Sequence, residues 1–360
     1  MMSPRRILII KSGDRGFTLV ELMVAVTLGL FLLIGLVSLL VSTVNSRSEL
    51  DKTTRQIDNG RYALQVLSEN IQLAGYVGAT ATTAFDTVQP VACPSALADL
   101  GYEAQTSPGT SKVPYPVFRL GSTPSCIGDV LSGTAMLLLT RVHTSAVPVA
   151  SAVATERYLQ VSTCSSDLVP FAVAAGSGAS AFNLMLKGCE SSKLAPLRKI
   201  VQQIYFVSSC NNCGTGGDST PTLKVAEYKN GTMSVTPLVE GVENLQFDYG
   251  IDMDGNGSPD CYTSNPSAPP AAEIDVAVCP QTTPTAYAWT NADTNWNNVM
   301  AVRVHVLARN LDGSAGWTDT RNYDLGLAVP AAGPFNDRIK RHVYSTVARL
   351  NNASGQRETP

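Results

Sequence analysis

The sequence predicts an α+β protein in which one long N-terminal α-helix packs on an antiparallel β-rich globular body. An apolar run over residues 17–41 is followed by a polar segment that keeps a helical repeat to about residue 75. Beyond it, short apolar or alternating segments are separated by turn residues, which is typical of antiparallel sheet. Helices and strands do not alternate along the chain, which argues against a doubly wound fold.

The first 41 residues combine a basic leader with an apolar helix. The run that starts at Phe17 lasts about 25 residues, long enough to cross a bilayer. In an ordinary secretory signal the apolar core precedes the cleavage site, whereas here the plausible junction, Gly16-Phe17, comes first. The positive-inside rule places the basic end in the cytoplasm and the body outside. The basic residues of the leader are Arg5, Arg6, Lys11 and Arg15, against Asp14.

Glu21 is the one charge inside the apolar run. A central acid in a membrane helix costs about 2.5–3.5 kcal/mol, and less near an end. One interpretation is that Glu21 simply snorkels to the interface. The other is that it needs a positive partner, which cleavage after Gly16 would supply as the new amino group of Phe17. In an array of such helices, a neighbour's amino terminus would neutralise Glu21.

The stretch Gly16-Phe17-Thr18-Leu19-Val20-Glu21-Leu22 resembles the class III signal of type IV pilins and type II secretion pseudopilins. The resemblance implies cleavage between Gly16 and Phe17 by prepilin peptidase, methylation of the Phe17 amine, and a role for Glu21 in the assembly register. It implies a prepilin leader over 1–16, a helix over 17–75 whose half 17–41 serves membrane and assembly, and a periplasmic or extracellular β-rich domain over 76–360. Pilins often carry a proline about two dozen residues into the mature chain, where this chain has only Gly29 and Gly35.

The second half of the helix is predicted to be amphipathic. Apolar residues recur at seven-residue spacing and define one stripe. Gly60 costs about 1 kcal/mol relative to alanine in mid-helix, so close packing is expected there. Gly75 is a plausible stop. The stripe consists of Leu50, Ile57, Leu64 and Ile71, with Leu67 and Ala74 on the same side.

Strand candidates follow a loop-rich stretch that extends to about residue 135. The clearest is 299–309, where alternation predicts a strand with one buried face. The others are 136–143, 157–163, 182–187, 199–207, 222–229, 244–250 and 342–350.

Several stretches resemble PilW-type minor pilins, and the resemblance is weak between about 79 and 200. They are residues 58–64 with 71–78, residues 238–250, residues 296–303, and residues 337–341 with 345–347.

Eight cysteines, all beyond the apolar run, indicate an oxidising compartment and up to four disulfides. The spacing does not fix the pairing, although pairs adjacent in sequence are favoured. Net charge is −3, and removal of the leader lowers it to −6, which argues against a nucleic-acid-binding body. The candidates are Cys93, Cys126, Cys164, Cys189, Cys210, Cys213, Cys261 and Cys279.

Residues 252–260 are the best candidate for a ligand site. Asp252, Asp254, Asn256 and Asp260, with Gly255 between them, follow the first part of a calcium loop. The twelfth position, which is normally Glu, is threonine. The competing interpretation is a plain Asx/Gly turn, which such residues make without metal, and this turn is slightly favoured over calcium.

Other chemistry finds little support in the sequence. Cys210-Asn-Asn-Cys213 has redox-motif spacing, but no helix follows to lower a thiolate pKa, so a structural disulfide is favoured over redox activity or metal binding. His143, His305 and His342 belong to no recognisable catalytic motif, and we expect no enzyme activity. The basic residues near the C-terminus are interpreted as a solvated strand face rather than a patch for DNA or an acidic partner. They are Arg338, Lys340, Arg341 and Arg349.

The PilW-type resemblance implies a minor pilin of a Gram-negative bacterium that helps to prime type IV pilus assembly and is not catalytic. Implied partners are other minor pilins, the major pilin, prepilin peptidase and the inner-membrane assembly platform, with no nucleic acid. The implied location is the inner membrane, single-pass with the body in the periplasm, and then the pilus. Such fimbriae serve adhesion and twitching motility. Alternatives are a J-like type II secretion pseudopilin and a calcium-dependent pilus-tip adhesin.

Overall fold

The structure is a computed structural model that describes residues 16, 18–79, 85–106, 111–280 and 286–358. It divides into two compact units, Met1–Asp51 and Lys52–Pro360.

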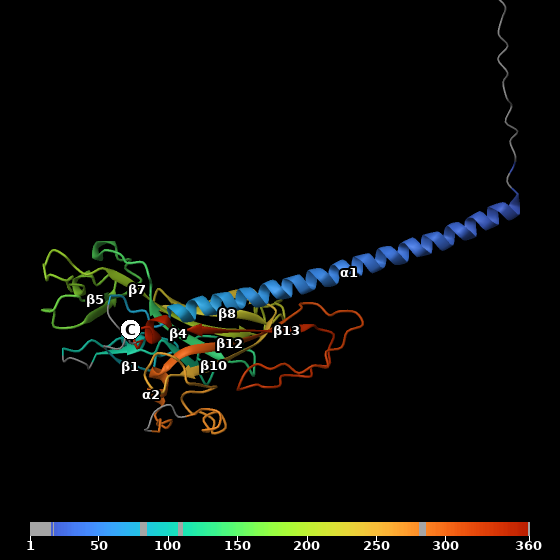
Figure 1. Ribbon diagram of the computed structural model, residues 1–360. Coiled ribbons are helices and arrows are strands. Elements are labelled where there is room, and N and C mark those ends of the chain that lie inside the picture. Colours follow the sequence, from blue (N-terminus) through green and yellow to red (C-terminus); the bar gives the residue numbers. More distant parts are fainter. Residues whose placement is uncertain (1–15, 17, 80–84, 107–110, 281–285, 359–360) are drawn as a thin grey trace, which may run out of the picture. The chain divides into compact units, whose positions relative to one another are not determined.

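Helix α1, Leu19–Leu73, is the longest element and begins close to the expected position (Figure 1). It ends where Gly75 adopts a φ of 74°, a left-handed conformation that favours glycine. The Gly75 N–H donates to the Thr140 carbonyl oxygen at 2.9 Å, which ties the end of the helix to the body. Phe17, the expected first helical residue, lies outside the described residues.

The buried face of α1 within the second unit differs from the predicted stripe. Its members are small or polar at the start and apolar toward the end: Gln56, Gly60, Ala63, Leu67 and Ile71. Leu67 and Ile71, together with Ala74 just beyond the end of the helix, were predicted correctly. Ile57 and Leu64 are only partly buried, and Leu50 is 66% exposed, so this part of the prediction was wrong. The helix turns its small residues toward the sheet, because they let the two backbones come close.

Within the part of the chain that the structure describes, the body contains two main β-sheets and one short parallel pair (Figure 1). The seven-stranded sheet has the order β3-β4-β7-β5-β6, with β8 on β7 and β9 on β8. Its strands are β3 Val117–Leu120, β4 Met136–Val142, β5 Arg157–Val161, β6 Phe171–Ala175, β7 Leu197–Ser208, β8 Thr222–Lys229 and β9 Thr232–Glu240.

The four-stranded sheet has the order β11-β10-β12-β13 and is antiparallel throughout. Its strands are β10 Val242–Ile251, β11 Cys261–Thr263, β12 Val299–Arg309 and β13 Arg341–Arg349. The parallel pair is β1 Asp86–Val88 and β2 Lys112–Pro114. Short helical turns complete the fold: η2 Ala98–Leu100, η3 Val149–Ser151, η4 Ala179–Ala181, α2 Ala292–Asn297 and α3 Asn351–Ser354.

One hydrophobic cluster joins both sheets to the helix. Leu67 and Ile71 of α1 lie in it together with Phe206 of β7 and Val304 of β12. Since no sheet or helix buries its apolar side alone, this shared core fixes the positions of α1, the seven-stranded sheet and the four-stranded sheet within the second unit.

Most predicted strands are present, and two expectations need correction. Residues 182–187 form no strand and make only an isolated bridge between Met185 and Leu194. Strand β12 was expected to bury one face, yet His305 and Leu307 on its other face are buried as well. The loop over 310–340 covers that face, and its Tyr323 and Leu325 pack on Leu307.

Candidate assembly site on the helix and its junction with the body

The N-terminal half of α1 presents an apolar surface with one acid near its start. Thr18 caps the helix: its hydroxyl oxygen accepts the Glu21 N–H at 3.3 Å, and its carbonyl oxygen accepts the Leu22 N–H at 3.1 Å. Thr18 is therefore the N-cap residue and Glu21 the third helical residue (N3). At N3 an acidic side chain interacts favourably with the positive end of the helix dipole.

The apolar side chains of this half are exposed, from Leu19 at 75% to Val41 at 52%. Among the described residues, α1 is the helix long and apolar enough to cross a membrane, with a mean hydropathy of 2.8 in its most apolar window. Gly16 is exposed, whereas Phe17, the predicted methylation site, lies outside the described residues. An exposed apolar helix needs lipid or other helices around it.

Residues 52–59 of α1 are bound to the body by side-chain hydrogen bonds to carbonyl oxygens of loops and strands. Gln56 Nε2 donates to the Ala308 and Lys340 carbonyl oxygens at 2.8 and 3.0 Å. Asn59 Nδ2 donates to the Glu240 carbonyl oxygen at 2.9 Å, and Lys52 Nζ donates to the Gly313 carbonyl oxygen at 3.0 Å. These bonds fix the rotation of the helix relative to the ends of β9 and β12.

Gly60 sits where the Tyr344 ring of β13 meets the helix. A Cβ atom at Gly60 would lie 2.3 Å from Cε2 and 2.4 Å from Cδ2 of that ring. The close packing expected at Gly60 is therefore confirmed. We call the contacts of Lys52, Gln56, Asn59 and Gly60 with the body the helix junction.

A buried ion cluster lies beside the helix junction and is organised by Arg341. Its guanidinium donates to Asp319 Oδ2 at 3.1 Å and to both oxygens of Asp337 at 2.7 Å. It also pairs with both carboxylate oxygens of Glu243. Burial alone would lower the pKa of Arg341, but the hydrogen bonds with Asp337 and Glu243 raise it. Hydrogen bonding from Arg341 lowers the pKa of Asp337.

The ion cluster and the helix junction unite stretches that are remote in sequence. Asn59 and Gly60 come from the first PilW-type stretch, Glu243 from the second, and Asp337 and Arg341 from the last. The third stretch belongs to neither and packs in the hydrophobic core, where the ring centroid of Trp296 lies 5.1 Å from that of Tyr249. Arg341 was interpreted from sequence as part of a solvated face. That was wrong, because only 3% of the residue is exposed.

The calcium-loop candidate forms a network of Asx-type turns. Asp252 Oδ1 accepts the N–H groups of Gly255 and Asn256 at 2.7 and 3.1 Å, and Oδ2 accepts that of Gly257 at 3.0 Å. One carboxylate oxygen each from Asp252, Asp254 and Asp260 lie within 4.8 Å of one another. Burial raises the pKa of Asp260.

The guanidinium of Arg357 lies beside Asp252 and supplies the positive charge that a bound cation would otherwise supply. Arg357 Nη1 lies 3.2 Å from Asp252 Oδ2. The Thr263 hydroxyl, at the twelfth position of the loop, donates to buried Glu273 at 2.8 Å. Calcium binding stays a prediction, and the contacts give Asp252 a charge partner without it.

All eight cysteines form disulfides, each between neighbours in the sequence, as the sequence favoured. The pairs are Cys93–Cys126, Cys164–Cys189, Cys210–Cys213 and Cys261–Cys279. Two of them close loops within the region where the PilW-type resemblance is weak.

One polar group that sequence reasoning missed links three strands. His305 Nδ1 lies 2.9 Å from Ser345 Oγ, and His305 Nε2 lies 3.1 Å from Asp248 Oδ2. Asp248 Oδ1 also accepts the Leu327 N–H at 3.0 Å, so the group holds the 310–340 loop on the sheet. The residues come from β10, β12 and β13 with no local spacing, so only cross-strand register brings them together.

Comparison with known families gives two matches. Residues 204–352 match the family described as Type IV Pilus-assembly protein W, and residues 11–37 match the prokaryotic N-terminal methylation motif. Over these two stretches the chain is similar to PilW-type minor pilins. The methylation-motif match contains Gly16, Phe17 and Glu21. The pilus-assembly match contains the whole of β8 to β13 and the ion cluster. No curated protein and no solved structure matches the chain.

These matches fit the expected limits of the resemblance. The pilus-assembly match begins within β7, so most of the region of weak resemblance, 79–200, lies outside both matches. A methylation motif followed by an apolar helix fits a pilin that is anchored in the inner membrane. The family description names pilus assembly, and neither match favours a secretion pseudopilus.

Proposed function

We propose that this chain is a minor pilin, a non-catalytic subunit that primes type IV pilus assembly together with other pilin subunits. Prepilin peptidase cleaves after Gly16, and the amine of Phe17 is methylated. Before assembly the chain lies in the inner membrane with its basic end in the cytoplasm and its body in the periplasm. The observation that carries the proposal is the methylation motif over residues 11–37, which runs into an exposed apolar helix, combined with the pilus-assembly match.

Glu21 is proposed to set the axial register of the assembling helices. It stands at the start of α1, among exposed apolar side chains that would be surrounded by lipid or by neighbouring helices. A carboxylate in that setting is costly unless a positive charge compensates it. The amino terminus that cleavage creates on a neighbouring subunit is the partner that the mature chain offers.

The helix junction and ion cluster are proposed to transmit this register to the body. Gln56, Asn59 and Gly60 hold the helix at a defined rotation, and Arg341 holds the loop that receives it. A groove of 460 Å³ opens beside the junction and is lined by Arg61, Trp317, Arg321 and Tyr344, among others. In an assembly of pilins this groove is a natural place for the body of a neighbouring subunit.

The cleavage step is tested by mass spectrometry of the mature N-terminus. We expect the chain to begin with N-methylated Phe17. A mature chain that begins anywhere else contradicts the proposed processing.

The assembly role is tested with Glu21→Ala in cells that carry the rest of the machinery. We expect the variant to be cleaved and to reach the membrane at normal levels, with piliation and twitching motility reduced at least tenfold. Glu49→Ala, an acid farther along the same helix, serves as the matched control and should leave piliation unchanged. Normal piliation with Glu21→Ala would contradict the register role.

Partners are tested by site-specific photo-crosslinking from Arg61, which is exposed beside the junction. We expect adducts with other pilin subunits in membranes of cells that assemble pili, and their loss in Glu21→Ala cells. Adducts restricted to components outside the pilus system would overturn the proposal.

A further inference from the structure

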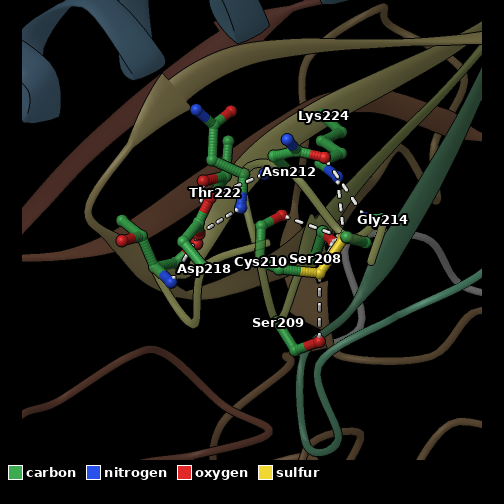
Figure 2. Close-up of a disulfide and its surroundings, with 11 residues drawn as sticks. Ser208, Ser209, Cys210, Asn212, Gly214, Asp218, Thr222 and Lys224 are labelled. Atoms are coloured by element: carbon green, nitrogen blue, oxygen red, sulfur yellow. Dashed lines mark hydrogen bonds between the residues drawn. A yellow bond between two sulfur atoms is a disulfide. The ribbon is translucent and has the colours of Figure 1, made fainter. Parts of the chain in front are cut away.

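The Cys210–Cys213 disulfide has a buried lysine directed at it. It lies in the loop between β7 and β8, and Lys224 of β8 approaches it from the sheet (Figure 2). Lys224 Nζ lies 3.2 Å from Cys213 Sγ, and the residue is only 7% exposed. None of the carboxylates in the described part of the chain forms an ion pair with Lys224.

The Lys224 ammonium is buried against the disulfide. The carboxylate of exposed Asp129, one oxygen of which lies within 4.8 Å of both sulfurs, faces the same site but forms no ion pair with the ammonium. A neutral sulfur is a weak hydrogen-bond acceptor, and burial of a charge is costly unless a counter-charge compensates it. Reduction of the disulfide would turn Cys213 into a thiolate, the group that a neighbouring lysine stabilises most. Lys224 therefore favours the reduced, ionised state of Cys213 over the disulfide.

Two serine hydroxyl groups and the greater exposure of Cys213 also favour opening of this disulfide by an incoming thiol. Ser208 Oγ lies 3.7 Å from Cys210 Sγ and 3.4 Å from Cys213 Sγ, and Ser209 Oγ lies 3.7 Å from Cys210 Sγ. Cys210 is buried, whereas Cys213 is more exposed. An incoming thiol would reach Cys213 first and leave Cys210 beside two hydroxyl donors.

The loop is also held in place without the disulfide. Asp218 accepts the N–H groups of Asn211, Asn212 and Thr220 at 2.9, 2.8 and 2.8 Å (Figure 2). These backbone hydrogen bonds, from Asn212 first, lower the pKa of Asp218 to about 2. The two thiols would therefore stay close after reduction, which makes the reaction reversible.

We propose that Cys210–Cys213 is a thiol–disulfide exchange site that takes dithiol reductants, with Lys224 stabilising the Cys213 thiolate. A thiolate of the dithiol attacks Cys213 Sγ, the Cys210–Cys213 bond breaks, and its electron pair goes to Cys210 Sγ, which takes a proton. The second thiolate of the dithiol then attacks its own sulfur in the mixed disulfide and expels Cys213 as a thiolate. The dithiol is oxidised to a disulfide by two electrons, and its second proton goes to solvent.

The first test compares the four disulfides within one molecule. The full chain in detergent micelles is equilibrated with graded dithiothreitol, alkylated and analysed by peptide mass spectrometry. We expect Cys210–Cys213 to open at a dithiothreitol concentration at least about tenfold below that required by any other disulfide, since one unit of thiol pKa corresponds to a factor of ten.

Lysine variants separate the charge effect from simple exposure. Lys224→Met should raise the dithiothreitol concentration needed about tenfold or more, while Lys224→Arg should keep most of the preference. Lys229→Met, on the same strand and far from the loop, is the matched control and should change nothing. If Lys224→Met opens as easily as the wild type, the proposal is wrong.

A second measurement does not depend on the folding of a lysine variant. Cys210→Ser leaves Cys213 as a single thiol, and its alkylation rate against pH gives the thiol pKa. We expect a value about one unit or more below the ordinary ~8.5 of a free cysteine. A value at or above ~8.5 with Lys224 present would overturn the proposal, because a disulfide with a purely structural role needs no such shift.

Discussion

Replacement of Arg341 by methionine tests the ion cluster most directly. The change removes the buried guanidinium shared by Asp319, whose side chain is fully buried, and Glu243, whose side chain is 15% exposed. The more distant Arg321, 3.5 Å from Asp319, and Arg309, 3.3 Å from Glu243, remain. Breaking a buried pair by removing one side typically costs about 3–5 kcal/mol, because an uncompensated charge remains. Because Arg309 and Arg321 still compensate part of the charge, we expect Arg341→Met to destabilise the body by about 3 kcal/mol, the lower end of that range, or roughly 6–12 °C in Tm at about 2–4 °C per kcal/mol.

The assay is thermal unfolding of the full chain in detergent, followed by near-ultraviolet circular dichroism, which reports on the body rather than on the apolar helix. Arg338→Met is the matched control, since Arg338 is exposed and three residues away. It should stay within about 0.5 kcal/mol of the wild type, as exposed substitutions usually do. An Arg341→Met body within 1 kcal/mol of the wild type would refute the reasoning, since it would mean that the three acids do not need the arginine.

The same variant carries a pH signature. The pKa of Asp337 is lowered in the folded state by its hydrogen bonds to Arg341. A depressed carboxyl pKa stabilises the fold above the unfolded value near ~3.9, and this stabilisation is lost as pH falls through the folded pKa. The stability difference between wild type and Arg341→Met should therefore narrow below about pH 4, and a difference that stays constant to lower pH would contradict the account.

Three further predictions concern other parts of the chain. Gly60→Leu should destabilise the body by about 1–3 kcal/mol through overpacking against Tyr344, as measured by thermal unfolding. Stability should recover in part in the double variant Gly60→Leu/Tyr344→Ala, and the control Gly35→Leu should lose none. Arg357→Gln should raise the calcium affinity of the loop at Asp252, measured by titration calorimetry. In the wild type we expect a dissociation constant of about 10⁻⁴–10⁻³ M or no binding. Equal affinities would show that Arg357 does not compete with the ion. Asp218→Ala should speed amide hydrogen exchange at Asn211 and Asn212 near neutral pH. The difference from the wild type should fade as pH falls through the Asp218 pKa of about 2, where half of the wild-type carboxylate is protonated. Unchanged protection at neutral pH would count against the loop anchor.

Elements with a strong local signal were predictable. The long helix, its stop at Gly75 and the strands β8 and β12 were predicted close to their observed bounds, because composition and periodicity act locally. The strand predicted over 182–187 failed since apolar residues alone do not provide a pairing partner. Edge strand β9 escaped notice because most of its side chains are exposed and it contains Pro237, so it lacks the alternation that marks a half-buried strand.

The candidate sites also differ in how far they could be predicted, depending on whether their residues are close together in the sequence. Gly16, Phe17 and Glu21 lie within a few residues of each other, so their pattern could be recognised without coordinates. The partners of Arg341 could not, because Glu243 is 98 residues away in sequence. The Cys210-Asn-Asn-Cys213 spacing was visible, but Lys224 beside it was not, and the expectation of an inert disulfide rested on the missing helix alone.

The sequence by itself determined the membrane-competent helix, the methylation motif and the all-disulfide chemistry of the body, because these depend on composition and short spacing. The tertiary structure decided which face of the helix meets the sheet, where the buried charges find partners and which disulfide has a lysine beside it. Those outcomes depend on contacts between residues far apart in the chain. Such contacts are set by strand register and by the close approach that Gly60 permits, and no local pattern records them.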